Sequence, residues 1–157
     1  MGKVFSVEDR ENAFRFILSA AGNCSRIVAL VQVGSGAEGY RDDRSDLDFV
    51  IALDSDESMP EVMDYMHREI AGKYGVLFFR QDEPRHLQCY VLSNLLEIDI
   101  GYGGYENAAA RKPAFKVLYD KPGGGHPVHG CLTSEDFLSR AGGTHMCSVL
   151  ITIKGSR

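Results

Sequence analysis

The sequence predicts an α/β protein, a mixed β-sheet with helices packed on it, and three observations support this class. Helical and extended segments follow one another in the order helix, strand, loop, strand, helix and then several strands, which is typical of such a sheet. Apolar residues in the helical segments recur three and four positions apart. Short, apolar, β-branched runs such as residues 27–33 indicate buried strands. At 157 residues the chain is long enough for one domain with its own core.

Two helices are predicted from their end signals and their apolar faces. The first begins after Ser6, which forms a capping box with Asp9, and ends near Gly22. Its apolar positions are Phe14, Ile17, Leu18 and Ala21. The second opens at Pro60 and closes at Gly75, with a buried face made of Val62, Met63, Met66 and Ile70.

Strands are expected in the segments between and after the helices. Residues 27–33 and a segment ending at residue 53 surround a glycine-rich loop. Residues 76–79 and 87–92 are separated by a turn at residues 82–85, and residues 95–100 return as a hairpin partner. A last strand is expected at residues 115–120. We therefore assign residues 1–122 to one domain and residues 123–157 to a tail whose structure the pattern does not define.

The composition excludes several function classes. A formal charge of -5 argues against the broad basic surface that non-specific nucleic-acid binding requires. No apolar stretch is long enough to span a bilayer, and the N-terminus lacks the apolar core of a secretion signal, so we expect a cytoplasmic protein. The cysteines are even in number but widely scattered, which favours reduced thiols over a disulfide framework. The tail holds zinc-type ligands, but their spacing fits no strong zinc template; they are His126, His129, Cys131, His145 and Cys147.

A glycine-rich loop follows the first predicted strand. Gly34, Ser35 and Gly39 belong to the run Gly-Ser-Gly-Ala-Glu-Gly, which lies where a strand gives way to a turn or a helix start. Glycine lets a phosphate approach the backbone amides closely, and Ser35 adds a hydroxyl donor. The loop is therefore a candidate phosphate-binding site.

Two carboxylates begin the next strand. Asp46 and Asp48 are two positions apart, and the period of a strand sends both side chains to the same face. Adjacent carboxylates repel each other, and a hard cation such as Mg²⁺ relieves that repulsion through oxygen ligands. This pair is a candidate metal site beside the phosphate loop.

Together these residues resemble the signature of the nucleotidyltransferase superfamily with the polymerase-beta-like fold. The resemblance covers roughly residues 26–120 and rests on Gly34-Ser35, Ala37, Gly39 and Ser45-Asp46-Leu47-Asp48. It implies a third carboxylate on a later strand, for which Asp99 is our choice and Glu97 the alternative. It also implies that Gly34, Ser35, Gly39 and Ser45 bind the nucleotide, and that Asp46, Asp48 and Asp99 bind two Mg²⁺ ions.

The activity that the resemblance implies is transfer of a nucleoside monophosphate from a triphosphate, with ATP the expected donor, to a hydroxyl of a small molecule. Pyrophosphate is released. The relatives it suggests are the aminoglycoside and lincosamide nucleotidyltransferases, and an acidic domain suits a cationic acceptor. Asp99 or Glu97 would take the acceptor's proton or hold the metal that lowers the hydroxyl pKa, and the sequence leaves these roles open.

Two other interpretations stay open. The enzymes that the chain resembles usually continue into a helical substrate domain, and residues 123–157 do not resemble a complete one. The chain is therefore also consistent with a minimal nucleotidyltransferase that modifies or masks a partner protein, as an antitoxin does, or with a homodimer that completes the site. The third interpretation is a nucleotide-binding module without turnover, which the three filled acid positions argue against.

Overall fold

The structure is a computed structural model of the chain, and it describes residues 4–34, 45–104, 115–120 and 132–133. The elements in chain order are α1 Val7–Gly22, β1 Ile27–Val33, β2 Leu47–Leu53, the 3₁₀ helix η2 Asp56–Ser58, α2 Met59–Lys73, β3 Val76–Asp82, β4 Leu87–Leu92, β5 Glu97–Gly104, β6 Phe115–Asp120 and β7 Leu132–Thr133.

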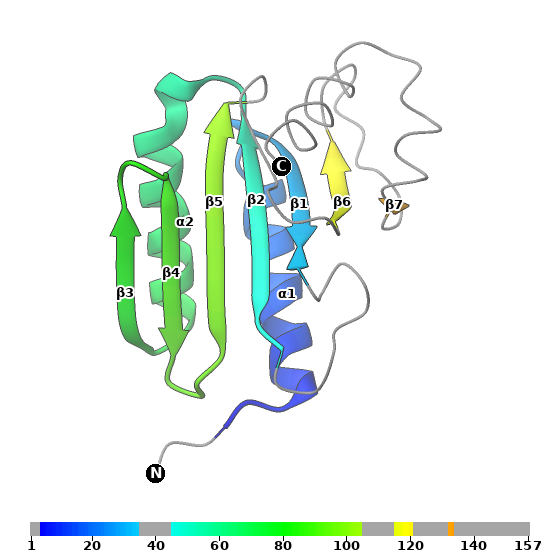
Figure 1. Cartoon of the computed structure of the whole chain (residues 1–157), viewed down its shortest axis with the longest axis vertical. Helices are drawn as coiled ribbons and strands as arrows, with labels where there is room; N and C mark the ends of the chain where they lie inside the picture. The colour runs from blue at the N-terminus through cyan, green and yellow to red at the C-terminus, as the bar shows by residue number, and fades with distance from the viewer. Residues whose placement is uncertain (1–3, 35–44, 105–114, 121–131, 134–157) are drawn as a thin grey trace.

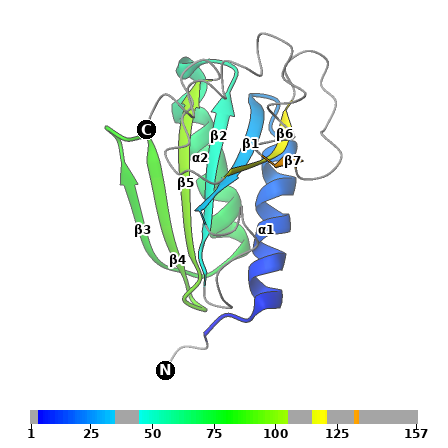
Figure 2. The same ribbon diagram turned by 45° about the vertical axis from the view of Figure 1, so that its right-hand side comes forward.

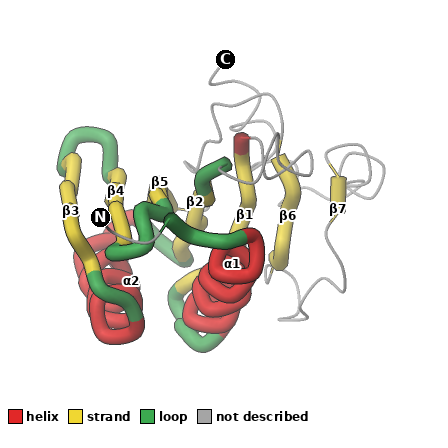
Figure 3. Tube along the Cα trace, turned by 90° about the horizontal axis from the view of Figure 1, so that it is seen from below, coloured by secondary structure: helices red, strands yellow, loops and turns green. Residues whose placement is uncertain are grey.

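The strands form one mixed sheet in the order β3-β4-β5-β2-β1-β6-β7 (Figure 1). β2 and β5 run parallel, whereas the other neighbouring strands pair antiparallel. Both helices lie against the same face of this sheet, as the rotated view and the view along the strands show (Figures 2 and 3). The α/β class with a mixed sheet is therefore confirmed.

The first helix begins as the sequence predicts. The Ser6 hydroxyl accepts from the Asp9 amide at 3.1 Å, and the Asp9 carboxylate accepts from the Ser6 amide at 2.9 Å. This capping box satisfies two backbone donors that a helix start otherwise leaves without partners. Ile17 and Ala21 are fully buried, while Phe14 and Leu18 are partly buried against the same core.

The second helix buries its predicted face against the sheet. Val62, Met63, Met66 and Ile70 are each at most 3% exposed. η2 precedes the helix, and Pro60 occupies its first turn, where a residue without an N–H costs no hydrogen bond. The polar segment that separates the second strand from this helix therefore forms a short 3₁₀ turn.

Alternation along the two parallel strands divides the sheet into two faces. Phe49 and Ile51 of β2 and Ile98 and Ile100 of β5 are buried in the core beneath the helices. The intervening positions, including Asp48 and Asp99, project from the opposite face because successive strand residues alternate. We call this opposite side of the sheet the acid face.

The strands expected from the sequence are present, and β3 extends to Asp82, beyond its predicted end. The expected division at residue 122 and the tail of residues 123–157 lie, except for β7, outside the described residues. Within the described part of the chain, we find no helix with both the length and the apolar character needed to cross a membrane.

Candidate active site

The parallel pairing of β2 with β5 brings the predicted acids together. Asp48 and Asp99 are direct register partners, although they are far apart in the sequence. Partners on adjacent parallel strands project to the same face about 4.8 Å apart along the hydrogen-bonding direction. Both side chains are half-buried. The sheet therefore places two of the three predicted metal-binding carboxylates side by side on the acid face.

Asp46 and Glu97 extend this pair into a cluster of four carboxylates. The pKa of Asp46 is raised from 3.8 to about 7, first by burial and then by the charge of Glu97 and a hydrogen bond with it. The charges of Asp48 and Asp99 raise the pKa further. A raised carboxylate pKa means that the ionised form of Asp46 is disfavoured in this buried and acidic surrounding.

The acid row continues across the sheet toward β3. Cys89 is the register partner of Asp99, and Arg80 is the register partner of Cys89. Arg80 Nη2 approaches Cys89 Sγ at 3.9 Å. Burial, a hydrogen bond with Asp99 and the charge of Asp99 raise the pKa of the Cys89 thiol, and the contact with Arg80 opposes them. The pairing of Cys89 with Asp99 was not predicted from the sequence, because the sequence of either strand by itself does not determine the register between them.

A buried arginine fixes the chain just before the acids. Arg10 of α1 is 4% exposed, and its Nη1 donates to the Ser45 carbonyl at 3.2 Å. A role for α1 at the site was not predicted from the sequence. The sequence does contain an indication of this role. Arg10 lies three positions before Ala13 and seven before Ile17, so it falls on the buried side of the helix. A charged residue on such a stripe needs a partner, and here it is the backbone next to Asp46.

The structure describes only the two ends of the predicted phosphate-binding loop. Gly34 follows β1 with a φ of 74°, a left-handed conformation that favours glycine. Ser45 is the residue bound by Arg10, and its predicted contact with nucleotide is not tested by the structure. Ser35 and Gly39 lie outside the described residues.

The donor chemistry of the cluster fits a hard divalent cation. The four carboxylates supply only oxygen ligands, and the charges of Glu97, Asp48 and Asp99 add to the effect of burial in raising the pKa of Asp46. Among the side chains that the structure describes, no group of three or more His, Cys, Asp or Glu residues is arranged to hold a metal ion. The metal-binding roles of Asp46, Asp48 and Asp99 therefore stay predictions.

Comparison with known proteins gives a weak structural likeness. No protein-family model matches the chain, and no curated protein sequence matches it. A similar solved structure is terminal uridylyl transferase 4 from Trypanosoma brucei with bound CTP, with 20% identity and a TM-score of 0.44. The match covers 67% of this chain and 34% of that protein, so this chain spans about a third of its length.

Proposed function

We propose that the chain is a nucleotidyltransferase that moves a nucleoside monophosphate from a nucleoside triphosphate to a hydroxyl group of a small acceptor, releasing pyrophosphate. The observation that carries this proposal is the register of Asp48 with Asp99 on adjacent parallel strands, with Asp46 and Glu97 beside them. Carboxylates arranged in this way suit transfer of a phosphoryl-type group, because catalysis of that reaction consists mainly of positioning the reactants and neutralising charge.

Each part of the site has an assigned task. Asp48, Asp99 and Asp46 would hold Mg²⁺, which when bound neutralises the triphosphate and stabilises the entering and leaving oxygens. The glycine turn that begins at Gly34 would receive the phosphates on its backbone amides. Arg10 holds the Ser45 carbonyl and thereby fixes the backbone that leads into the acids.

The acceptor's proton has two candidate recipients, Asp99 and Glu97. Glu97 is exposed at the start of β5 and bonds with Asp46, whereas Asp99 is half-buried beside Asp48. A residue that holds metal is needed for nucleotide binding, whereas a residue that only accepts the proton is needed for turnover. Asp99→Asn and Glu97→Gln therefore separate the roles. The base variant keeps magnesium-dependent nucleotide affinity and loses turnover with an altered pH profile.

Calorimetric titration with ATP, GTP, CTP and UTP, in Mg²⁺ and in EDTA, tests the nucleotide site. We expect magnesium-dependent binding of one triphosphate, with ATP the first choice, and at least a tenfold weaker affinity, about 1.4 kcal/mol, in Asp48→Asn. Glu8→Gln, an exposed carboxylate on α1, is the matched control and keeps wild-type affinity. Binding that is equally strong in EDTA and in Asp48→Asn would contradict the metal assignment.

Turnover is then measured as pyrophosphate release in the presence of hydroxylated amines. Aminoglycosides and lincosamides are the first acceptors to screen, because a chain of formal charge -5 favours a cationic acceptor. Asp48→Asn should lower kcat about a hundredfold or more, as loss of a residue that stabilises developing charge does. Wild-type turnover in Asp48→Asn would exclude this mechanism.

A further inference from the structure

β3 is an edge strand of the sheet. Within the described part of the chain it pairs only with β4, so its other side presents backbone amides and carbonyls that no described strand binds. Natural proteins protect such edges with proline, with lysine or by keeping the strand very short. β3 is seven residues long and reads Val-Leu-Phe-Phe-Arg-Gln-Asp, without proline or lysine. It therefore offers an edge on which another strand can pair.

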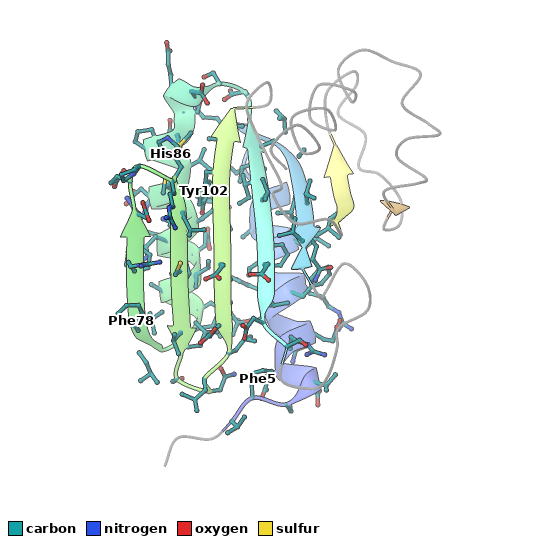
Figure 4. The ribbon with its side chains drawn as sticks, viewed as in Figure 1. Phe5, Phe78, His86 and Tyr102 are labelled. Carbon is teal, nitrogen blue, oxygen red and sulfur yellow. The ribbon has the colours of Figure 1, made fainter. Side chains whose placement is uncertain are left out.

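The most exposed side chains of this edge are apolar. Leu77 is 63% and Phe78 is 55% exposed, the two largest values among the exposed large hydrophobic residues of the described chain. Figure 4 shows Phe78 on β3, at the outer edge of the sheet. The register of β3 with β4 shifts between Val76 and Phe78, so Leu77 has no register partner on β4. Burying these two side chains in an interface would remove apolar surface from water, which favours association.

The sequence of β3 suits antiparallel pairing with a second copy of itself. A two-fold axis at Phe79 places Phe79 opposite its own counterpart, Phe78 opposite Arg80 and Leu77 opposite Gln81. Aromatic pairs across strands are favourable, and a guanidinium group on an aromatic ring adds a cation–π contact. An axis one residue further along would instead set Arg80 opposite Arg80, and like charges directly opposite are unfavourable. The pattern therefore selects the axis at Phe79.

Helix α2 brings complementary charges beside the same axis. Figure 3 shows α2 against the β3–β4 end of the sheet, and Asp64 and His67 line a cavity together with Gln81 of β3. The ring centroids of His67 and Phe79 are 4.2 Å apart, so His67 lies level with the axis. Asp64 and Arg68, on either side of His67 in the sequence, pair at 3.0 Å and are 66% and 69% exposed. A two-fold pair of antiparallel α2 helices would set each acid near the base of the other copy.

We propose that the β3 edge is a homodimer surface, on which β3 of a second copy pairs antiparallel about a two-fold axis at Phe79 and continues the sheet. Such an interface uses the same surface of both partners, which the pairing of β3 with itself and the charges of α2 both satisfy. Because the axis is perpendicular to the sheet, the second copy does not lie over Asp48 or Asp99. The proposal is therefore separate from nucleotidyl transfer and does not depend on it.

The proposed interface is small, since it consists of one strand edge and one side of a helix. Specific, stable interfaces bury about 1,200–2,000 Å² in total. We therefore expect a reversible dimer, whose share of the protein rises with protein concentration.

Analytical ultracentrifugation of the full chain over a range of protein concentrations tests the dimer. We expect a monomer–dimer equilibrium in the wild type, and at least an approximately tenfold higher dimer Kd in Leu77→Lys, which sets a charge in the interface. Because Leu77 is exposed, this variant should fold as the wild type does. Val4→Lys changes another apolar residue, 50% exposed and outside β3, and is the matched control that keeps the wild-type Kd.

Charge reversal on α2 tests the position of the axis. Asp64→Lys and Arg68→Glu each leave like charges facing each other across the axis, so each should raise the dimer Kd. The double variant Asp64→Lys/Arg68→Glu restores the opposite charges within and between the helices and should return the Kd to that of the wild type. Wild-type Kd values in both single variants would exclude an axis at Phe79.

Hydrogen–deuterium exchange distinguishes a second copy from other occupants of the edge. We expect the amides of residues 76–82 to exchange more slowly at high protein concentration than at low, and Leu77→Lys to remove this difference. Protection of β3 that is equal at all concentrations would mean that another segment of the same chain covers the edge. That result, a protein that stays monomeric, or a dimer that Leu77→Lys leaves intact would each overturn the proposal.

Discussion

Asp46 makes the stability of the metal-free protein depend on pH. Its folded pKa is about 7 against a usual 3.8, so the folded state keeps a proton that the unfolded state releases. The stabilisation is complete below pH 3.8 and is lost as the pH rises through about 7. In EDTA, we expect Asp46→Asn to be more stable than wild type at pH 8. The difference in stability should be only about 1 kcal/mol, because solvent screens the charges at this partly exposed site.

Urea unfolding of both proteins at pH 5 and pH 8 measures this effect. The difference between them should grow with pH, because the asparagine side chain does not titrate. Glu57→Gln removes an exposed carboxylate from η2 and should show no such growth. Parallel pH profiles for wild type and Asp46→Asn would show that the acid cluster does not perturb this carboxylate.

At the scale of the elements, β5 offers a pair of glycines for testing the acid face. A Cβ built at Gly101 finds its nearest atom, the Phe49 carbonyl oxygen, at 4.0 Å, whereas one built at Gly104 lies 2.6 Å from Asp56 Oδ1. Gly101 projects to the same face as Asp99, two positions away. Gly101→Ala should therefore fold normally but weaken nucleotide or acceptor binding several-fold, since substrate would meet the added methyl group.

Gly104→Ala is the contrasting variant. It crowds Asp56 and should lower the melting temperature without acting on the acid face. Thermal unfolding and the KM values of the two variants distinguish these effects. An unchanged KM in Gly101→Ala would mean that the substrate does not lie over this part of β5.

The contact between α1 and the start of β2 gives a third prediction. Arg10→Met keeps most of the buried aliphatic chain but loses the bond to the Ser45 carbonyl. We expect a loss of about 1 to 3 kcal/mol of stability, as for a charge-assisted hydrogen bond, and a larger fractional loss of turnover because the acids are less well fixed. Arg15→Met, on the exposed side of the same helix, should change neither quantity. Turnover that falls only in proportion to the folded fraction would indicate a purely structural role.

The helices and strands could be predicted from the sequence more fully than the contacts between them. Apolar periodicity and end signals located α1, α2 and the strands, because those signals lie within each segment. The spacing of Asp46 and Asp48 also predicted that they share a face. Nothing local could show that Asp99 pairs with Asp48, or that Cys89 follows in the same row, because register depends on how separate strands meet.

For the whole molecule, both helices cover one face of the sheet (Figure 3). Alternation along β2 and β5 leaves Asp48 and Asp99 on the other face. A cation bound at the acid face would therefore stabilise the folded state without rearranging the core. Binding at a hundredfold excess over Kd adds about 2.7 kcal/mol of stability, measured as a rise in melting temperature with Mg²⁺.

The size of that rise should itself depend on pH. Above pH 7 Asp46 is ionised and ready to accept the cation, whereas at pH 5 a proton must first leave, so Mg²⁺ should stabilise the protein more at pH 8 than at pH 5. Asp48→Asn should abolish most of the rise at both pH values, and Glu8→Gln should retain it. An equal rise in Asp48→Asn would place the cation away from β2 and β5, and with it the assignment of these acids to catalysis would fail.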